Sequence, residues 1–139
     1  MLTKEERNLR KLLQLWAVLL TGCTLVFLFG GNFLLSTINE ISARFNLPFV
    51  QLPLPVENFW MTLTLSLMTL LIFLSIAGAK DIRGNRITVP AILVSKFASS
   101  FFFFFFFMKS SRSLAYLVGL FTDGSMFLVT YYFYSKLRK

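Results

Sequence analysis

The feature that most constrains this chain is a set of four apolar stretches, separated by short polar or basic segments. They cover residues 12–35, 59–79, 87–108 and 114–134. A helix needs about 20 mostly apolar residues to cross the hydrocarbon core of a bilayer. We therefore predict an all-α polytopic membrane protein, a four-transmembrane-helix up-down-up-down bundle, with residues 1–139 forming a single integral membrane domain.

The composition agrees with this prediction and narrows the chemistry. Hydrophobic residues make up 56% of the chain and charged residues 14%, whereas a soluble domain carries roughly 25% charged residues. The chain has no His and one Cys, which removes His-ligated and Cys-cluster metal sites and intrachain disulfides. We expect no metal, no cofactor and no enzymatic activity.

The basic residues predict the orientation of the spans. Ten of the fourteen Lys and Arg lie in the two tails and in the segment 80–86, while Arg44, Lys109 and Arg112 fall on the other side. Because cytoplasmic loops are enriched in Lys and Arg, we expect a multi-pass protein of the cell membrane, provisionally a bacterial inner membrane, with both termini cytoplasmic. The expected partners of these cations are anionic lipid headgroups. We expect no nucleic-acid binding, since no basic domain stands apart from the spans.

The long external segment between the first two stretches predicts a short helix. Thr37-Ile38-Asn39-Glu40 has the spacing of a capping box, and Ile38, Ile41 and Phe45 then fall on one apolar face. This pattern is typical of an interfacial helix in the first external loop. An extended course is predicted to follow by three prolines, Pro48, Pro53 and Pro55. The segment is interpreted as a packed connector or, alternatively, as a lid or docking surface.

The single cysteine carries two interpretations. Leu20-Thr21-Gly22-Cys23 resembles the bacterial lipoprotein signal, which implies cleavage before Cys23 and lipidation of its thiol. However, the apolar run continues through residues 24–29, where a lipoprotein has a polar tether. We therefore favour an uncleaved first span with Cys23 as a small buried residue, and keep lipidation as the alternative.

Two charged residues lie near the middle of apolar stretches, Lys96 in the third and Asp123 in the fourth. A charge at the centre of a bilayer costs about 2.5–3.5 kcal/mol on insertion scales. The segment 109–113 is too short to separate these two spans, so they must be antiparallel neighbours. Counting from the turn at 1.5 Å per residue, the two residues differ in depth by about 4.5 Å, which a Lys side chain bridges. We predict that Lys96 and Asp123 pair.

Small and polar residues recur at helical spacing around this intramembrane charge pair, and we expect them to support a polar core. They are Ser99 and Ser100 in the third stretch, Thr62, Ser66 and Thr69 in the second, and Tyr116 and Thr130 in the fourth.

Seven consecutive phenylalanines, Phe101 to Phe107, follow this polar segment in the third stretch. Phe103, Phe104 and Phe107 continue the face of Lys96 and are predicted to seal the polar core from the external side. The others must face lipid, another subunit or a flat cofactor, and nothing in the sequence points to a ligating residue for the last.

These features predict a small integral membrane protein that is an accessory, assembly or interaction subunit of a larger membrane complex. In this hypothesis the Lys96–Asp123 pair locks spans three and four, and other membrane subunits or a second copy contact the Phe-rich third span. The alternative is a small transporter or proton-coupled membrane protein that uses Lys96 and Asp123 as its midplane site. A catalytic Lys96 would need companion motifs that the sequence lacks.

Overall fold

The computed structural model describes residues 2–30, 32–54, 59–85, 87–110 and 112–137, and in that part of the chain it is all-helical, with no strand. Its five helices are α1 (Lys4–Gly30), α2 (Phe33–Arg44), α3 (Phe59–Lys80), α4 (Thr88–Lys109) and α5 (Leu114–Lys136). All except α2 are long and apolar enough to cross a membrane. The prediction of an all-α fold is confirmed, and the four long helices have the length and apolar composition predicted for membrane spans.

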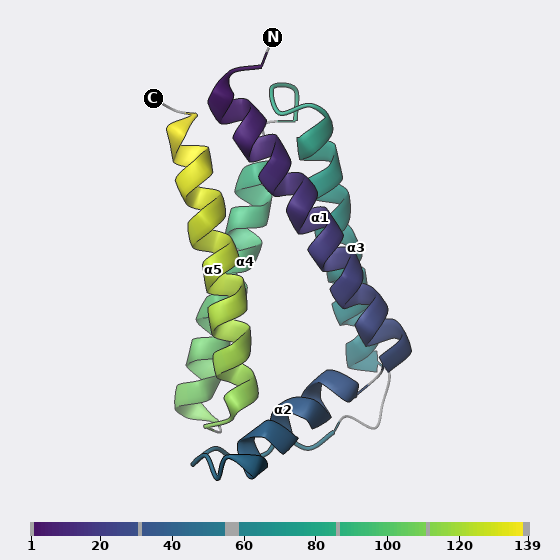
Figure 1. Ribbon diagram of the computed structural model, residues 1–139, viewed down its shortest axis with the longest axis vertical. Helices are drawn as coiled ribbons and strands as arrows, with labels where there is room; N and C mark the ends of the chain where they lie inside the picture. The colour runs from purple at the N-terminus through teal and green to yellow at the C-terminus, as the bar shows by residue number, and fades with distance from the viewer. Residues whose placement is uncertain (1, 31, 55–58, 86, 111, 138–139) are drawn as a thin grey trace.

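The four long helices form two side-by-side pairs, α1 with α3 and α4 with α5 (Figure 1). The pairs lie close together at the end of the molecule that holds both chain termini, and they separate toward the opposite end. There α2 lies across the ends of the long helices. The arrangement is therefore packed at one end and open at the other.

The buried core follows this shape. Its largest members are Leu9 and Leu13 of α1 and Ile92 of α4, all almost fully buried. Leu71 and Ala79 of α3 also belong to this core. Gly78 allows a close approach, since a Cβ added there would lie 2.6 Å from Thr88 Oγ1 and 3.1 Å from Leu13 Cδ1. Three helices therefore meet at this glycine.

The first helix begins and ends differently from the prediction. Its start is fixed by a capping box, in which Thr3 N donates to Glu6 Oε2 at 2.7 Å and Glu6 N donates to Thr3 Oγ1 at 3.2 Å. It ends at Gly30, so the prediction of one span reaching residue 35 is wrong. The sequence has two consecutive glycines at 30 and 31, and glycine disfavours a helix interior.

The short helix begins before its predicted capping box. The Thr37–Glu40 segment lies inside α2, whose N-cap is Asn32, so the prediction of a helix start at Thr37 is wrong. At the other end Asn46 adopts a φ of 47°, and Asn46 N and Leu47 N donate to Ala43 O and Ser42 O, respectively. This pattern is a Schellman motif, which asparagine tolerates in place of glycine.

The return segment after α2 is held against the protein. Asn39 Nδ2 donates to Leu52 O at 2.8 Å, and Leu52 N donates back to Asn39 Oδ1 at 3.2 Å. Val50 N donates to Arg112 O at 2.9 Å, which ties this segment to the connection between α4 and α5. Of the three prolines predicted to shape it, Pro48 and Pro53 belong to non-helical backbone, and Pro55 lies outside the described residues.

Candidate functional site: the intramembrane charge pair

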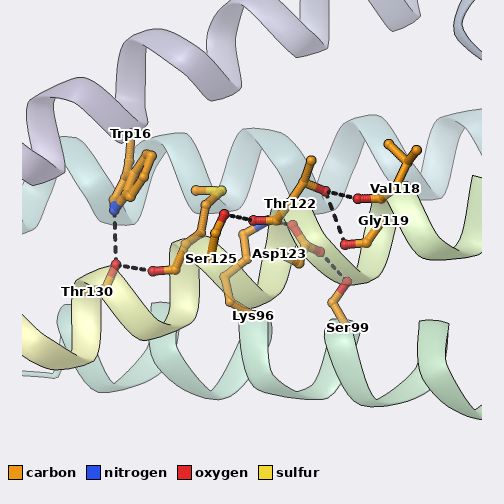
Figure 2. A network of polar contacts seen from close by, with 10 residues as sticks. Trp16, Lys96, Ser99, Val118, Gly119, Thr122, Asp123, Ser125 and Thr130 are labelled. Carbon is orange, nitrogen blue, oxygen red and sulfur yellow. Dashed lines mark hydrogen bonds and ion pairs between the residues drawn. The ribbon is translucent and has the colours of Figure 1, made fainter.

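The two charged residues in the middle of the spans meet in the structure. Lys96 Nζ donates to Asp123 Oδ1 at 2.7 Å across the interface between α4 and α5 (Figure 2). The side chains are 8% and 16% exposed, respectively. The contact exists because few residues separate the end of α4 at Lys109 from the start of α5 at Leu114, where Ser113 caps α5 by accepting a hydrogen bond from Ala115 N. The short turn thus sets the register in which the two charges face each other.

The second carboxylate oxygen of Asp123 is also occupied. Ser99 Oγ donates a short hydrogen bond to Asp123 Oδ2, and the figure shows Lys96 and Ser99 reaching the same carboxylate from α4. Lys96 and Ser99 are three residues apart and therefore share one face of the helix. Both oxygens of this partly buried acid accept hydrogen bonds from one neighbouring helix, and such additional bonds help to offset the cost of taking an ion pair out of water.

Gly119 of α5 lets α4 approach closely near Asp123, whereas Gly124 is only in ordinary contact with that helix. A Cβ added at Gly119 would lie 2.6 Å from the ring of Phe103, and one added at Gly124 would lie 3.5 Å from Ser100 Oγ. Ser100 Oγ is buried and has no hydrogen-bond partner among the described residues. Ser100 therefore packs beside the charge pair without bonding to it.

Thr130 connects the charge-bearing pair of helices to α1. It is almost fully buried, donates to Met126 O at 2.6 Å and accepts a hydrogen bond from Trp16 Nε1 at 2.9 Å. The bond to Trp16 is visible in Figure 2. Trp16 was not identified from the sequence, because a lone Trp in an apolar stretch gives no signal of its partner. Tyr116, at the other end of α5, instead packs against Phe103 and Phe106.

The hydroxyls of the second stretch do not join this site. Thr62, Ser66 and Thr69 are all exposed, so the prediction that they face the interior of the bundle does not hold. Ser66 and Thr69 donate to the carbonyl oxygens of Thr62 and Leu65 within their own helix. A hydroxyl that bonds back in this way needs no partner from a second helix. The buried hydroxyl of α3 is that of Ser75, which was not singled out in the sequence.

The seven phenylalanines divide unequally between interior and surface. Phe103 packs over Gly119 and against Tyr116, and Phe107 contacts Phe49 of the return segment with ring centroids 6.4 Å apart. Phe104, which was also predicted to seal the core, is exposed. The exposed members are Phe101, Phe102, Phe104, Phe105 and Phe106, and we call this set the Phe surface.

The single cysteine lies in the middle of an unbroken helix. Cys23 is exposed, so the prediction of a buried residue is wrong. The buried face of α1 is formed by Leu9, Leu13, Ala17 and Leu20, and a Cβ added at the adjacent Gly22 would meet no atom within 4 Å. Among the described residues of α1, none beyond Leu20 is buried, and Cys23 belongs to this exposed part of the helix.

A second ion pair lies at the end of the molecule that holds the termini. Arg83 donates from Nε to Glu6 Oε1 at 2.7 Å and from its terminal nitrogen to Glu6 Oε2 at 2.9 Å. This bidentate contact raises the pKa of the Arg83 guanidinium above its ordinary value. It joins the capping box of α1 to the turn between α3 and α4. Thr3 and Glu6 have the capping-box spacing, so the sequence contained a signal for the helix start but none for the Arg83 contact.

The arrangement offers one partly buried acid that accepts hydrogen bonds from one buried base and one hydroxyl. Such a set can fix the register of two helices or exchange a proton, but in the part of the chain that is described no group of three or more His, Cys, Asp or Glu could hold a metal ion. Comparison of the chain with protein-family models, with curated proteins and with solved structures finds no match.

Proposed function

We propose that this protein is a small integral membrane protein that acts as an accessory, assembly or interaction subunit of a larger membrane complex. In this proposal the Lys96–Asp123 pair is a lock between the third and fourth spans. The helices so locked present the Phe surface to another membrane subunit or to a second copy of the chain.

The observation that carries the proposal is that both carboxylate oxygens of Asp123 accept hydrogen bonds from the neighbouring helix. Lys96 and Ser99 occupy both oxygens of Asp123, and all three residues belong to one helical hairpin. Removing one member of a buried ion pair strands the other charge, whereas the intact pair contributes little net stability. A pair of this kind therefore specifies how two helices dock.

The Phe surface supports the interaction part of the proposal. Five phenylalanines of α4 are each at least 40% exposed. Phe101 and Phe105 stack with ring centroids 6.5 Å apart, and Phe105 and Phe106 meet edge to face at 5.5 Å. Aromatic side chains are enriched at protein interfaces because they bury large areas with few rotatable bonds. Because these rings are already stacked against one another, they lose less side-chain conformational entropy when a partner binds.

We infer an up-down-up-down topology with both termini in the cytoplasm. The basic tails and the basic segment 80–86 support this orientation. In this orientation α2 is the interfacial helix of the first external loop. Its polar Asn39 is bonded to the return segment and Ser42 is buried, whereas Ile41 and Phe45 are exposed. Apolar residues directed away from the protein suit a helix lying in the membrane interface.

The test is a site-specific photo-crosslink in the native membrane. A photoreactive phenylalanine analogue replaces Phe102 in one variant and Leu67, an equally exposed residue of α3, in a control. The proposal predicts that the Phe102 variant forms one discrete protein adduct, either a homodimer or a fixed partner that also co-purifies in mild detergent. Adducts with lipid alone, or the same proteins captured from both positions, would contradict it.

The transport alternative is favoured by one observation, the incomplete burial of Asp123, whose side chain is 16% exposed against 8% for Lys96. An ionisable group within a membrane-spanning helix that is partly accessible from the protein surface suits a proton site. The Lys96→Met, Asp123→Leu double variant tests this alternative. A transporter would fold and lose its cellular activity, and full activity in the double variant would end the hypothesis.

A further inference from the structure

A groove of about 530 Å³ runs along the contact between α1 and α3, away from the charge pair. It exists because the residues at its floor are small. Ala17 of α1 and Ala79 of α3 are both buried, and their methyl groups leave space that larger side chains would fill. Val18 and Ile76, which are 70% and 46% exposed, form apolar walls.

One end of the groove is basic. Arg10 of α1 and Lys80, the last residue of α3, line it there, and among the described residues no Asp or Glu does. Neither cation has an ion-pair partner in the part of the chain that the structure describes, in contrast to Arg83, which Glu6 binds. The groove therefore has two exposed cations above an apolar floor.

The groove extends along α1 from its basic end to an uncharged end. From Arg10, the lining continues down α1 through Gln14 and Val18 to Thr21. At 1.5 Å per residue, Arg10 and Thr21 are separated by about 16 Å, which is roughly half the hydrocarbon thickness of a bilayer. Thr21 bonds to Ala17 O within its own helix, so the deep end presents little unsatisfied polarity. The groove thus extends from headgroup level into one leaflet.

We propose that this groove binds one anionic phospholipid, with its phosphate between Arg10 and Lys80 and an acyl chain along Val18, Ala17 and Ile76. The proposal rests only on the orientation given above, in which the basic end lies at the cytoplasmic leaflet. That leaflet carries the anionic lipids of a cell membrane, and basic pockets between membrane-spanning helices bind their headgroups. Two cations without an acid match one phosphate diester better than a zwitterionic headgroup.

The experiment titrates the full chain, purified in a non-ionic detergent, with phosphatidylglycerol and with phosphatidylcholine of identical acyl chains. Native mass spectrometry counts the bound lipids. We expect one tight phosphatidylglycerol site per chain and no comparable phosphatidylcholine site. The Arg10→Gln, Lys80→Gln double variant should bind phosphatidylglycerol about 25-fold more weakly, since each cation near an anionic lipid contributes about fivefold.

The matched control is the Arg7→Gln, Lys11→Gln double variant. It removes the same charge from the same end of α1, but neither residue lines the groove. Its affinity should stay within about twofold of the wild-type value, because charges outside the site act only through the screened surface potential. Equal losses in the two double variants would overturn the proposal, since they would mean general attraction to a basic surface.

A second variant, Val18→Trp, keeps both cations and fills the groove below them. Because Val18 is exposed, the substitution should not disturb folding. It should abolish the preference of the wild-type chain for long-chain over short-chain phosphatidylglycerol, and an unchanged preference would contradict the acyl-chain part of the proposal. A different outcome would make the groove a protein interface instead. In that case the wild-type chain would be dimeric without bound lipid, and the Arg10→Gln, Lys80→Gln variant would be monomeric. All readings come from the isolated chain, so failure of the photo-crosslink does not affect them.

Discussion

The two pairs of long helices are held together by different means. Between α1 and α3 the contact consists of apolar and small residues, with Leu13, Leu71 and Gly78 at its centre. Between α4 and α5 the contact is organised around Lys96 and Asp123. Lipid tails are as apolar as leucine, so apolar helix contacts in a bilayer depend on shape. A charge pair adds an energetic penalty for every register of the two helices except the one in which the charges meet. The α1–α3 contact therefore depends on how well the side chains fit, whereas the α4–α5 contact also selects one register.

The largest expected effect comes from breaking the charge pair on one side. Asp123→Leu leaves Lys96 buried without its counter-ion, and such a change typically costs about 3–5 kcal/mol. We expect the free energy of unfolding to fall by this amount, measured by detergent-induced unfolding in mixed micelles with circular dichroism as the readout. Lys96→Met should have an effect of the same order.

Two double variants distinguish a lock from a site with another purpose. Lys96→Met with Asp123→Leu removes both charges, and we expect it to regain most of the stability lost by either single variant. The exchange of Lys96→Asp with Asp123→Lys should restore stable insertion as well. If both double variants are as unstable as the single ones, direct pairing does not determine how α4 and α5 dock.

A smaller effect is expected from the hydroxyl that completes the site. Ser99→Ala removes the hydrogen bond to Asp123 Oδ2 and should lower the free energy of unfolding by about 1.5–3 kcal/mol, the range for bonds to charged groups. Ser100→Ala is the matched control, because Ser100 Oγ has no hydrogen-bond partner among the described residues. The same unfolding assay should find it nearly neutral, and equal effects at the two serines would contradict the assigned geometry.

The first pair of helices should respond to shape instead of charge. Gly78→Ala places a methyl group against Thr88 Oγ1 and Leu13 Cδ1, and overpacking of this kind typically costs about 1–3 kcal/mol. Gly22→Ala is the control, since nothing lies within 4 Å of its added Cβ, and the better helix propensity of alanine should make it neutral or stabilising. Thermal unfolding of the two variants in detergent measures the difference. If the Gly78→Ala protein is as stable as the wild type, the three helices do not pack closely at this residue.

The parts of the fold that could be predicted from the sequence depend on long, repeated signals. Four apolar stretches defined the four long helices to within a few residues, apart from the two ends of α1. The meeting of Lys96 with Asp123 followed from a five-residue connection and the helical rise. Two charges in apolar surroundings constrain each other strongly, because the cost of leaving either one unpaired is large.

The parts that could not be predicted are those for which the sequence offers two alternatives, such as two helix starts or two faces of one span. The capping-box spacing occurs at Thr3–Glu6 and again at Thr37–Glu40, but only the first begins a helix. In the second, α2 has already begun at Phe33, so the Thr37–Glu40 segment lies inside the helix. Cys23 and Phe104 could not be assigned to a face, since which side of a span is covered depends on how far its neighbours diverge. Periodicity alone carries no information on that divergence.

The smallest expected effect concerns the hydroxyls that the sequence placed inside the bundle. Ser66→Ala with Thr69→Val removes two side chains that bond only to their own helix and lie exposed, so the free energy of unfolding should change by no more than about 0.5 kcal/mol. Ser75→Val is the control within α3, because Ser75 is fully buried and added volume there should cost about 1–3 kcal/mol. The same detergent unfolding assay compares the two. A loss at Ser66 and Thr69 as large as that at Ser99 would mean that this face of α3 is covered, and that the helix pairs close against each other where the structure holds them apart.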